Sequence, residues 1–144
     1  GLFVYYFGSK KKYTDFEVSF KYKAISGNSG LYFRTVKTEN FVKGLQAEVD
    51  SNGYNAGGLY EALGRAWTVK VSPEKVATFY KKHDWNEMTV RAVGKDVTVY
   101  VNGVKTSELL NDGGATEGIF GFDLHGGMDM EVYYKDIMVK DLSQ

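Results

Sequence analysis

The sequence has no cysteine and only one proline in 144 residues. Without cysteine the chain can form no disulfide scaffold, no zinc site made of thiolates and no cysteine nucleophile. The scarcity of proline leaves glycine, with 17 residues, as the main turn former.

The chain also lacks a long hydrophobic run and any excess of charge. No apolar segment approaches the roughly 20 residues that a membrane helix needs, so we expect no membrane span. Lys plus Arg and Asp plus Glu both total 18. Nucleic acid and anionic membranes require a concentrated basic face, so we expect neither as the main partner.

Aromatic residues are abundant at 15% of the chain, and hydrophobic residues make up 43%. The mean hydropathy of −0.33 is typical of a soluble globular protein. A length of 144 residues suits one domain, which we place over residues 1–144. The chain begins at Gly1, so we expect a processed or trimmed product.

The apolar residues alternate with polar ones along most of the chain, which predicts strands. Met88, Val90 and Ala92 form one apolar stripe, and Val97, Val99 and Val101 form another after Gly94. This pattern predicts a hairpin.

One segment departs from the alternation. Ser72 suits an N-cap and Pro73 the first helical position, so we expect a short helix over about residues 73–82. The remaining pattern predicts an all-β fold, in which two antiparallel sheets form a jelly-roll-like sandwich.

Three of the expected strands carry unusual polar residues on one face. Gln46, Glu48 and Asp50 share a face by alternation, and so do Tyr32 with Arg34 and Asp123 with His125. A solvent-facing side of an antiparallel sheet is normally polar, and this is one interpretation. The other is a ligand groove, since the chain places one of its three Arg and one of its two His here. Such groups bind sugar hydroxyls or transfer protons.

Same-face residues on a strand lie roughly 6.5–7 Å apart, so Glu48 and Asp50 could act as a base and its partner. This spacing fits glycosidases of both stereochemical outcomes, so it selects no mechanism. Glu48, Asp50, Asp123 and His125 could also supply ligands for a divalent cation, although no compact metal motif accompanies them.

The segment GGLYEALGRAW at 57–67 adds Tyr60, Glu61, Arg65 and Trp67. An exposed Trp near a Tyr can stack on a sugar ring, whereas a buried Trp67 would belong to the core. We expect His83 to be a surface residue and Trp85 to be a structural residue at the start of a strand.

Several blocks in their order resemble the 3-keto-disaccharide hydrolase family. They are YTDFEVSFKYKA, GNSGLYFRT, VKGLQAEVD, GGLYEALGRAW, WNEMTVRAVGKDVTVYVNG, GIFGFDLHGG and VYYKDIMVKDL, and they span about residues 13–142. The resemblance implies a concanavalin A-like jelly roll, export from the cell and action on oxidised glycosides.

The resemblance also implies the residues of the site. The motifs correspond to Arg34, Gln46, Glu48, Asp50, Tyr60, Glu61, Arg65, Trp67 and His125 of this sequence. In this scheme Glu48 or His125 is the base, Asp50 orients its neighbour, and the others bind substrate. Asp123 stands where many members have Gln, and it adds a carboxylate or blunts activity. A divalent cation could polarise the substrate instead.

Related retaining glycosidases carry a strand motif that resembles E-x-D-x-x-E. Here Gly53 occupies the position of its second Glu, so we set that mechanism aside. The leading prediction is an enzyme that cleaves 3-keto-glycosides. The alternatives are a carbohydrate-binding module without activity and a structural sandwich within a larger assembly.

Overall fold

The computed structural model describes residues 2–5, 10–125 and 129–143, and for residues 2–5, 124 and 125 it describes the backbone alone. The described elements, in chain order, are β1 (Leu2–Tyr5), β2 (Phe16–Ser26), β3 (Asn28–Lys37), β4 (Val42–Asp50), β5 (Leu59–Ala62), β6 (Ala66–Val69), α1 (Pro73–Val76), β7 (Asn86–Val93), β8 (Asp96–Val101), β9 (Val104–Leu109), β10 (Ile119–His125) and β11 (Glu131–Asp141).

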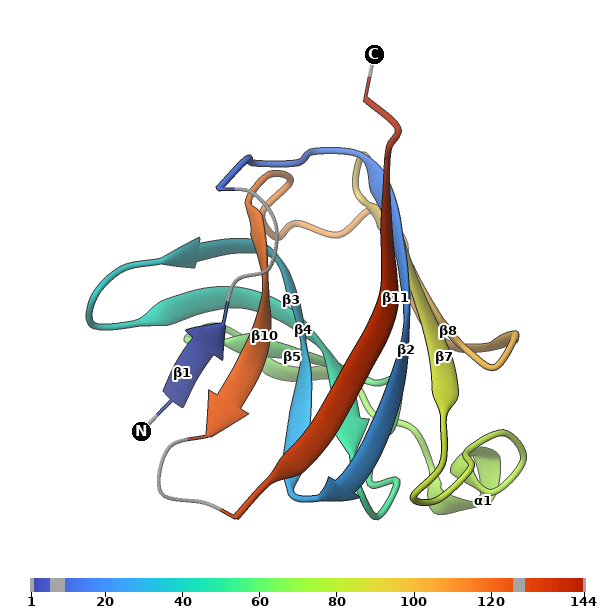
Figure 1. The fold of residues 1–144 in the computed structure, drawn as a ribbon. Helices are drawn as coiled ribbons and strands as arrows, with labels where there is room; N and C mark the ends of the chain where they lie inside the picture. Colours follow the sequence, from blue (N-terminus) through green and yellow to red (C-terminus); the bar gives the residue numbers. More distant parts are fainter. Residues whose placement is uncertain (1, 6–9, 126–128, 144) are drawn as a thin grey trace.

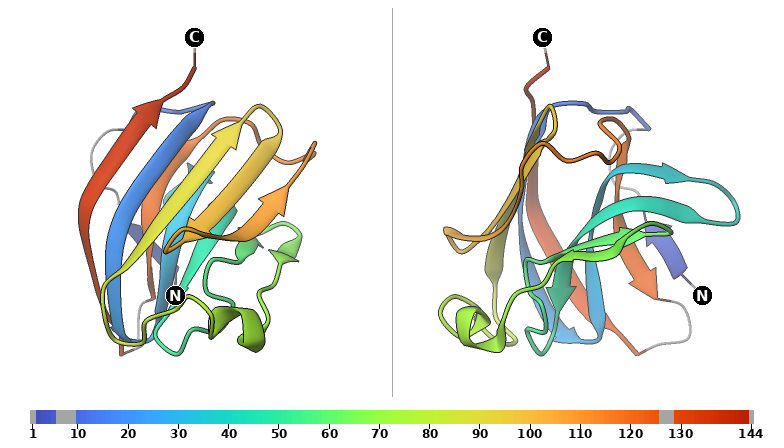
Figure 2. Two further views of the ribbon diagram at one scale, coloured as in Figure 1. Left: turned by 90° about the vertical axis from the view of Figure 1, so that its right-hand side faces the viewer. Right: turned by 180° about the vertical axis from the view of Figure 1, so that it is seen from behind.

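The strands form two antiparallel sheets that face each other (Figure 1). One sheet has six strands in the order β1-β10-β3-β4-β5-β6, and the other has five in the order β11-β2-β7-β8-β9. Figure 2 shows the five-stranded sheet face on, with α1 below it at one end of the sandwich. The prediction of an all-β sandwich with one short helix is therefore confirmed.

The core lies between the sheets and follows the predicted alternation. Phe16, Val18 and Phe20 of β2 are buried against Phe120 and Phe122 of β10. The ring centroids of Phe20 and Phe122 lie 5.4 Å apart in an edge-on arrangement. Because alternate residues point to opposite faces, the outward residues of the six-stranded sheet are left to form a second surface.

The helix is shorter than predicted and covers Pro73–Val76 instead of 73–82. Ser72 caps it as expected, since its hydroxyl accepts the N–H of Lys75 at 3.2 Å. The Thr78 hydroxyl donates to the Lys75 carbonyl at 2.6 Å, and the Thr78 N–H bonds to the same carbonyl. This local bonding favours a tight turn over a continuing helix.

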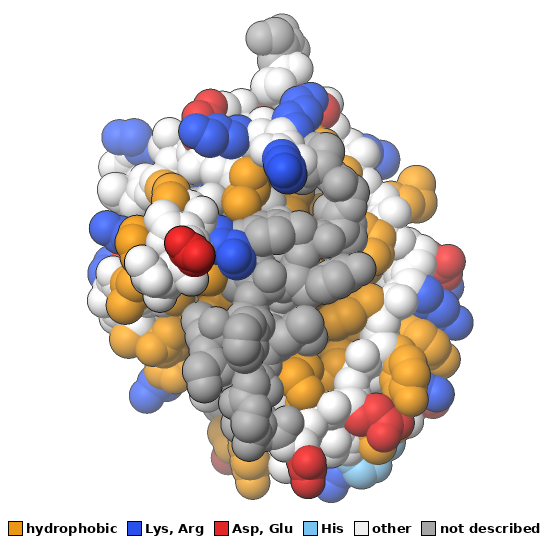
Figure 3. Space-filling view, turned by 60° about the vertical axis from the view of Figure 1, so that its left-hand side comes forward, with side chains coloured by type: hydrophobic (Ala, Val, Ile, Leu, Met, Phe, Trp, Pro, Cys, Tyr) orange, Lys and Arg blue, Asp and Glu red, His pale blue; other side chains and the backbone are white. Residues whose placement is uncertain are grey.

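The predicted hairpin is present as β7 and β8, with Val93 opposite Asp96 across a two-residue turn. Among the residues that the structure describes, no helix is long and apolar enough to cross a membrane. In the view of Figure 3, Lys and Arg side chains lie scattered with Asp and Glu side chains among them.

Candidate functional site

A pocket of about 370 Å³ lies on the outward surface of the six-stranded sheet. We call it the carboxyl pocket. Its lining residues are Asn28, Tyr32, Val42, Gln46, Glu48, Tyr60, Ala62, Leu63, Trp67 and Asp123. One part of this lining carries acids and amides, and the other is aromatic and aliphatic.

The acidic part is a row of residues that crosses three strands. Gly30 of β3 stands opposite Glu48 of β4. On the other side of β3, Phe122 pairs with Leu31, and continuing this register brings Asp123 opposite Gly30. Two carboxyls therefore flank a residue without a side chain, and their backbones are about 9–10 Å apart because neighbouring strands are spaced about 4.8 Å.

Gly30 leaves the space between the two carboxyls open for another side chain. A Cβ atom at this position would lie 2.5 Å from Cγ of Gln46 and 2.6 Å from the carbonyl oxygen of Ala47. The Gln46 side chain therefore lies over Gly30, and its Nε2 donates to Oε1 of Glu48 at 2.6 Å.

The backbone of Glu48 is held from the side of β5 and from the opposite sheet. Its N–H donates to the Gly58 carbonyl at 2.9 Å, and its carbonyl accepts the Gly57 N–H at 3.0 Å. The Gly57 carbonyl in turn accepts the hydroxyls of Thr106 and Ser107 from β9, at 2.8 and 2.7 Å.

Glu48 is 5% exposed, and its electrostatic surroundings favour the neutral acid. Burial, together with the nearby Asp50 and Asp123 carboxyls, raises the pKa of Glu48 to about 9, while a hydrogen bond with the Asn28 side chain opposes the rise. A carboxyl with this pKa keeps its proton at neutral pH and can donate it.

Asp123 is 2% exposed and differs from Glu48 in its acidity. Burial raises the pKa of Asp123 to about 7, so it changes charge near neutral pH. Its backbone carbonyl accepts the Ser29 hydroxyl at 2.7 Å, and the Tyr134 hydroxyl donates to Ser29 at 2.6 Å. Two carboxyls with separated pKa values can serve as proton donor and proton acceptor.

The aromatic part of the pocket comes from the neighbouring row of the sheet. Tyr32 stands opposite Gln46, Gln46 opposite Tyr60, and Tyr60 opposite Trp67. The rings of Tyr60 and Trp67 meet edge to face with centroids 5.2 Å apart. Trp67 is half-buried and lines the pocket rather than the core.

Of the predicted site residues, Gln46, Glu48, Tyr60, Trp67 and Asp123 come together in the carboxyl pocket. Asp50 lies at the end of β4 and outside the lining. Its carboxylate accepts the N–H of Asn52 at 2.8 Å and also bonds the N–H groups of Gly53 and Tyr54. The geometry therefore assigns Asp50 to the turn that follows the strand.

Arg34 lies outside the pocket, and the prediction that it shares a face with Tyr32 is wrong. The register between β3 and β4 shifts by one residue after Phe33, and Arg34 has a φ of 49°. Such a bulge reverses the side on which the next residues point. The guanidinium of Arg34 is buried at the end of the core, where it donates to the carbonyls of Thr14 and Gly94 at 3.0 and 2.8 Å.

Glu61 and Arg65 also lie outside the pocket lining. Arg65 forms ion pairs with Glu61 at 2.7 Å and with Asp112 at 2.6 Å. The network connects the turn after β5 to the loop between β9 and β10. These two residues stabilise the loop and do not face the carboxyl pocket.

His125 ends β10, and its side chain lies outside the described residues. Among the side chains that are described, no three acidic or histidine residues gather as metal ligands. Asp50, one of the predicted metal ligands, is engaged in the turn that follows β4.

Asn28 is a polar pocket residue that the sequence did not predict. The segment SGNSG at 26–30 has the composition of a turn, but β2 ends at Ser26 and β3 begins at Asn28. Gly27, with a φ of 77°, forms the connection alone. Alternation from Tyr32 back through Gly30 would have placed Asn28 on the pocket side.

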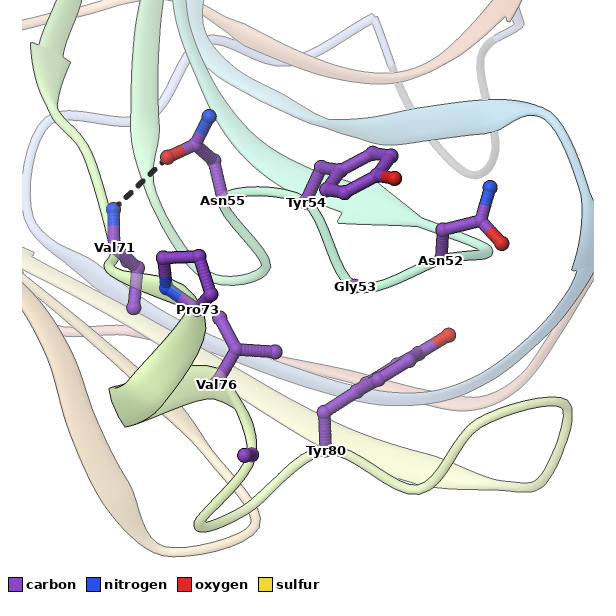
Figure 4. A pocket seen from close by; sticks show the side chains of 9 residues that line it. Asn52, Gly53, Tyr54, Asn55, Val71, Pro73, Val76 and Tyr80 are labelled. Carbon is purple, nitrogen blue, oxygen red and sulfur yellow. Dashed lines mark hydrogen bonds between the residues drawn. The ribbon is translucent and has the colours of Figure 1, made fainter.

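A second pocket, of about 380 Å³, lies beside α1 (Figure 4). We call it the helix pocket. It is lined by Asn52, Gly53, Tyr54, Asn55, Val71, Pro73, Val76, Ala77 and Tyr80. The side-chain oxygen Oδ1 of Asn55 accepts the Val71 N–H at 3.0 Å, and the Tyr80 hydroxyl donates to the Ser51 backbone carbonyl at 3.1 Å. No Asp, Glu, Lys, Arg or His belongs to this lining.

Residues 5–140 match the family described as the 3-keto-alpha-glucoside-1,2-lyase-like domain. The chain belongs to this family. A comparison with curated proteins gives no significant match. The 3-keto-alpha-glucoside-1,2-lyase-like match confirms the resemblance seen in the ordered sequence blocks.

Solved structures share the fold at low sequence identity. The carbohydrate-binding module CBM66 from Bacillus subtilis is 16% identical, with a TM-score of 0.68 over 90% of this chain and 77% of that one. A Parabacteroides distasonis protein, provisionally named a glycosyl hydrolase, is 18% identical, with a TM-score of 0.68 over 93% and 81%. The CG-16 agglutinin from chicken liver is 15% identical, with a TM-score of 0.56 over 97% and 100%.

Proposed function

We propose that the protein cleaves glycosides that carry a ketone at C3 of the sugar ring, and that the carboxyl pocket is the active site. The carrying observation is the pair of buried carboxyls, Glu48 and Asp123, whose pKa values are raised to about 9 and about 7. The aromatic row of Tyr60 and Trp67 beside them offers a surface on which a sugar ring can stack.

In the proposed reaction Asp123 is the base. A ketone at C3 acidifies the proton on C2, and ionised Asp123 removes it. The electron pair of the C2–H bond forms the C1=C2 double bond as the C1–O bond to the leaving group breaks. Asp123 then returns the proton to the departing oxygen, and addition of water to the double bond completes the hydrolysis.

Glu48 has a different role in this mechanism, because it keeps its proton at neutral pH. It donates a hydrogen bond to the C3 carbonyl oxygen, where negative charge develops when C2 is deprotonated. This revises the prediction from sequence, in which Glu48 or His125 is the base.

The proposal predicts a bell-shaped pH dependence. Activity requires ionised Asp123 and protonated Glu48, so kcat/KM should rise through a pH of about 7 and fall through about 9. The rate should be measured with saturating and with dilute substrate across this range. A profile that keeps rising above both values contradicts the assignment of Glu48 as the proton donor.

The experiment that tests the function compares an alkyl 3-keto-glucoside with the corresponding glucoside. We expect the wild-type protein to release the alcohol only from the ketone, as followed by mass spectrometry. Absence of product from both compounds refutes the enzymatic proposal.

The second candidate is a carbohydrate-binding module without catalysis. The fold similarity to the Bacillus subtilis carbohydrate-binding module and the aromatic wall favour it. Saturable saccharide binding in calorimetry, with no product from the 3-keto-glucoside, would support this candidate over the enzyme.

A further inference from the structure

Two amide side chains meet at Glu48 and leave their oxygens unused. The side-chain nitrogen Nε2 of Gln46 donates to Glu48, and the side chain of Asn28 also forms a hydrogen bond with Glu48. The carbonyl oxygens Oε1 of Gln46 and Oδ1 of Asn28 are buried and have no hydrogen-bond partner among the described residues. A buried acceptor without a partner is unfavourable, and a donor from a ligand would offset this cost.

The strand register sets the order of these groups. Along β4, Gln46 lies two residues before Glu48, whereas Asn28 of β3 stands opposite Asp50, two residues after it. The two amides therefore approach Glu48 from opposite directions along the strand. Along the strand the groups therefore follow in the order Gln46 amide oxygen, Glu48 carboxyl and Asn28 amide oxygen.

We propose that Gln46, Glu48 and Asn28 together recognise a carbonyl group flanked by two hydroxyls. The carboxyl of Glu48 donates to the carbonyl oxygen, and the two amide oxygens accept from the flanking hydroxyls. In the substrate this edge is the C2 hydroxyl, the C3 ketone and the C4 hydroxyl. The inference rests on the proposed function and makes Gln46 and Asn28 specificity-determining residues.

In this scheme the protonated carboxyl of Glu48 distinguishes the oxidised sugar from its parent. A hydroxyl at C3 can either accept from a neutral carboxyl or donate to a carboxylate, whereas a ketone can only accept. Ketone binding should therefore weaken when Glu48 ionises, while binding of the parent sugar should change less. The raised pKa of Glu48 keeps the donor available at neutral pH.

The test measures the dissociation constants of a methyl 3-keto-glucoside and of methyl glucoside by calorimetry. Asp123→Asn is used as the background, so that the ketone is not consumed during the titration. Asn28→Leu and Gln46→Met are each added to it, since both remove an amide at nearly constant size. Asn52→Leu, which changes an exposed amide of the helix pocket, is the matched control.

We expect the background protein to prefer the ketone. Each test variant should bind both sugars about tenfold more weakly, the usual effect of losing one buried polar contact, because both sugars carry the C2 and C4 hydroxyls. Asn52→Leu should leave both affinities unchanged. Thermal melting monitors folding, and Asn28→Ser with Gln46→Leu replaces any variant that is unfolded.

Unchanged affinity for both sugars in both test variants overturns the inference, and so does equal or absent binding of the two sugars in the background protein. If wild-type protein still cleaves the 3-keto-glucoside in that case, only the recognition scheme fails. If it does not, the proposed function fails as well.

Discussion

The carboxyl pocket and the helix pocket have nearly the same size, about 370 and 380 Å³, but differ in their chemistry. The first buries two carboxyls, and it also buries the side-chain oxygens of Gln46 and Asn28, which lack hydrogen-bond partners among the described residues. In the second, Asn55 and Tyr80 form hydrogen bonds that join the turn after β4 to the segment around α1. The carboxyl pocket holds ionisable groups where burial disfavours their charged form. In the helix pocket the polar groups form hydrogen bonds that stabilise the fold.

This contrast indicates that the two pockets contribute differently to activity and to stability. Buried ionisable groups are unfavourable for folding, and they persist where a site needs shifted pKa values. We therefore expect changes in the carboxyl pocket to affect activity, and changes in the helix pocket to affect stability.

The largest effect should come from the base. Asp123→Asn keeps the size and polarity of the side chain but removes its ability to accept the C2 proton. Loss of a general base typically costs about 10²–10⁴-fold in rate, and we expect this loss in kcat with a small change in KM. Asn52→Ala in the helix pocket is the control. Activity near that of wild type after Asp123→Asn would exclude Asp123 as the base.

A pair of glycine substitutions should separate the pockets further. At Gly53 the φ of 80° and the approach of a new Cβ to 2.9 Å from Tyr80 predict strain, so Gly53→Ala should lower the free energy of unfolding by about 1–3 kcal/mol. Gly30→Ala would displace the Gln46 side chain and reduce activity as well. Urea denaturation and the cleavage assay should be run on both variants. A loss of activity with Gly53→Ala equal to that with Gly30→Ala would remove the distinction.

Glu48→Gln should stabilise the protein at alkaline pH while impairing catalysis. Burial raises the pKa of Glu48 from 4.5 to about 9, so between these values the folded protein retains a proton that the unfolded chain has lost. The free energy of unfolding therefore falls as pH rises through this window. A neutral amide removes this cost, and we expect a gain of about 1–2 kcal/mol near pH 8.

Near pH 3.5 the gain from Glu48→Gln should vanish, because at a pH below the unfolded-state pKa the carboxyl is largely neutral in both states. Urea denaturation at the two pH values checks this expectation. A gain of equal size at both would indicate an effect of packing instead of ionisation.

The smallest effect concerns the aromatic walls. Trp67→Ala should weaken saccharide binding by about five- to tenfold, because aromatic contacts contribute about 0.5–1.5 kcal/mol beyond buried area. Tyr54→Ala, which removes an exposed ring of the helix pocket, should leave the affinity unchanged. Calorimetry with the same saccharide compares the two. Equal losses would show that the sugar contacts both pockets.

The alternation of the sequence was sufficient to predict the sandwich and the outward direction of Gln46, Glu48 and Asp123. It failed for Arg34 because one extra residue in β3 reverses the alternation, and this bulge has no visible signal in LYFRT. It also could not show that Arg65 pairs with Asp112, since that contact joins segments 47 residues apart.

Asn28 was missed for a different reason. Its surroundings, rich in Gly and Ser, are typical of a turn, and only the pairing of Asn28 with Asp50 makes it part of a strand. The acidities could not be predicted either, because the pKa values of Glu48 and Asp123 depend on burial that the complete fold creates. The roles of His125 and the export of the protein stay predictions.

The hydroxyls of Thr106 and Ser107 that bind the Gly57 carbonyl join the two sheets directly behind Glu48. A change in how the sheets pack against each other would therefore reach the backbone of Glu48 through one residue, Gly57. Substitutions of Thr106 or Ser107 in β9, which contributes no residue to the lining of the carboxyl pocket, should therefore shift the position of Glu48. The five-stranded sheet therefore helps to position Glu48, although Glu48 belongs to the other sheet.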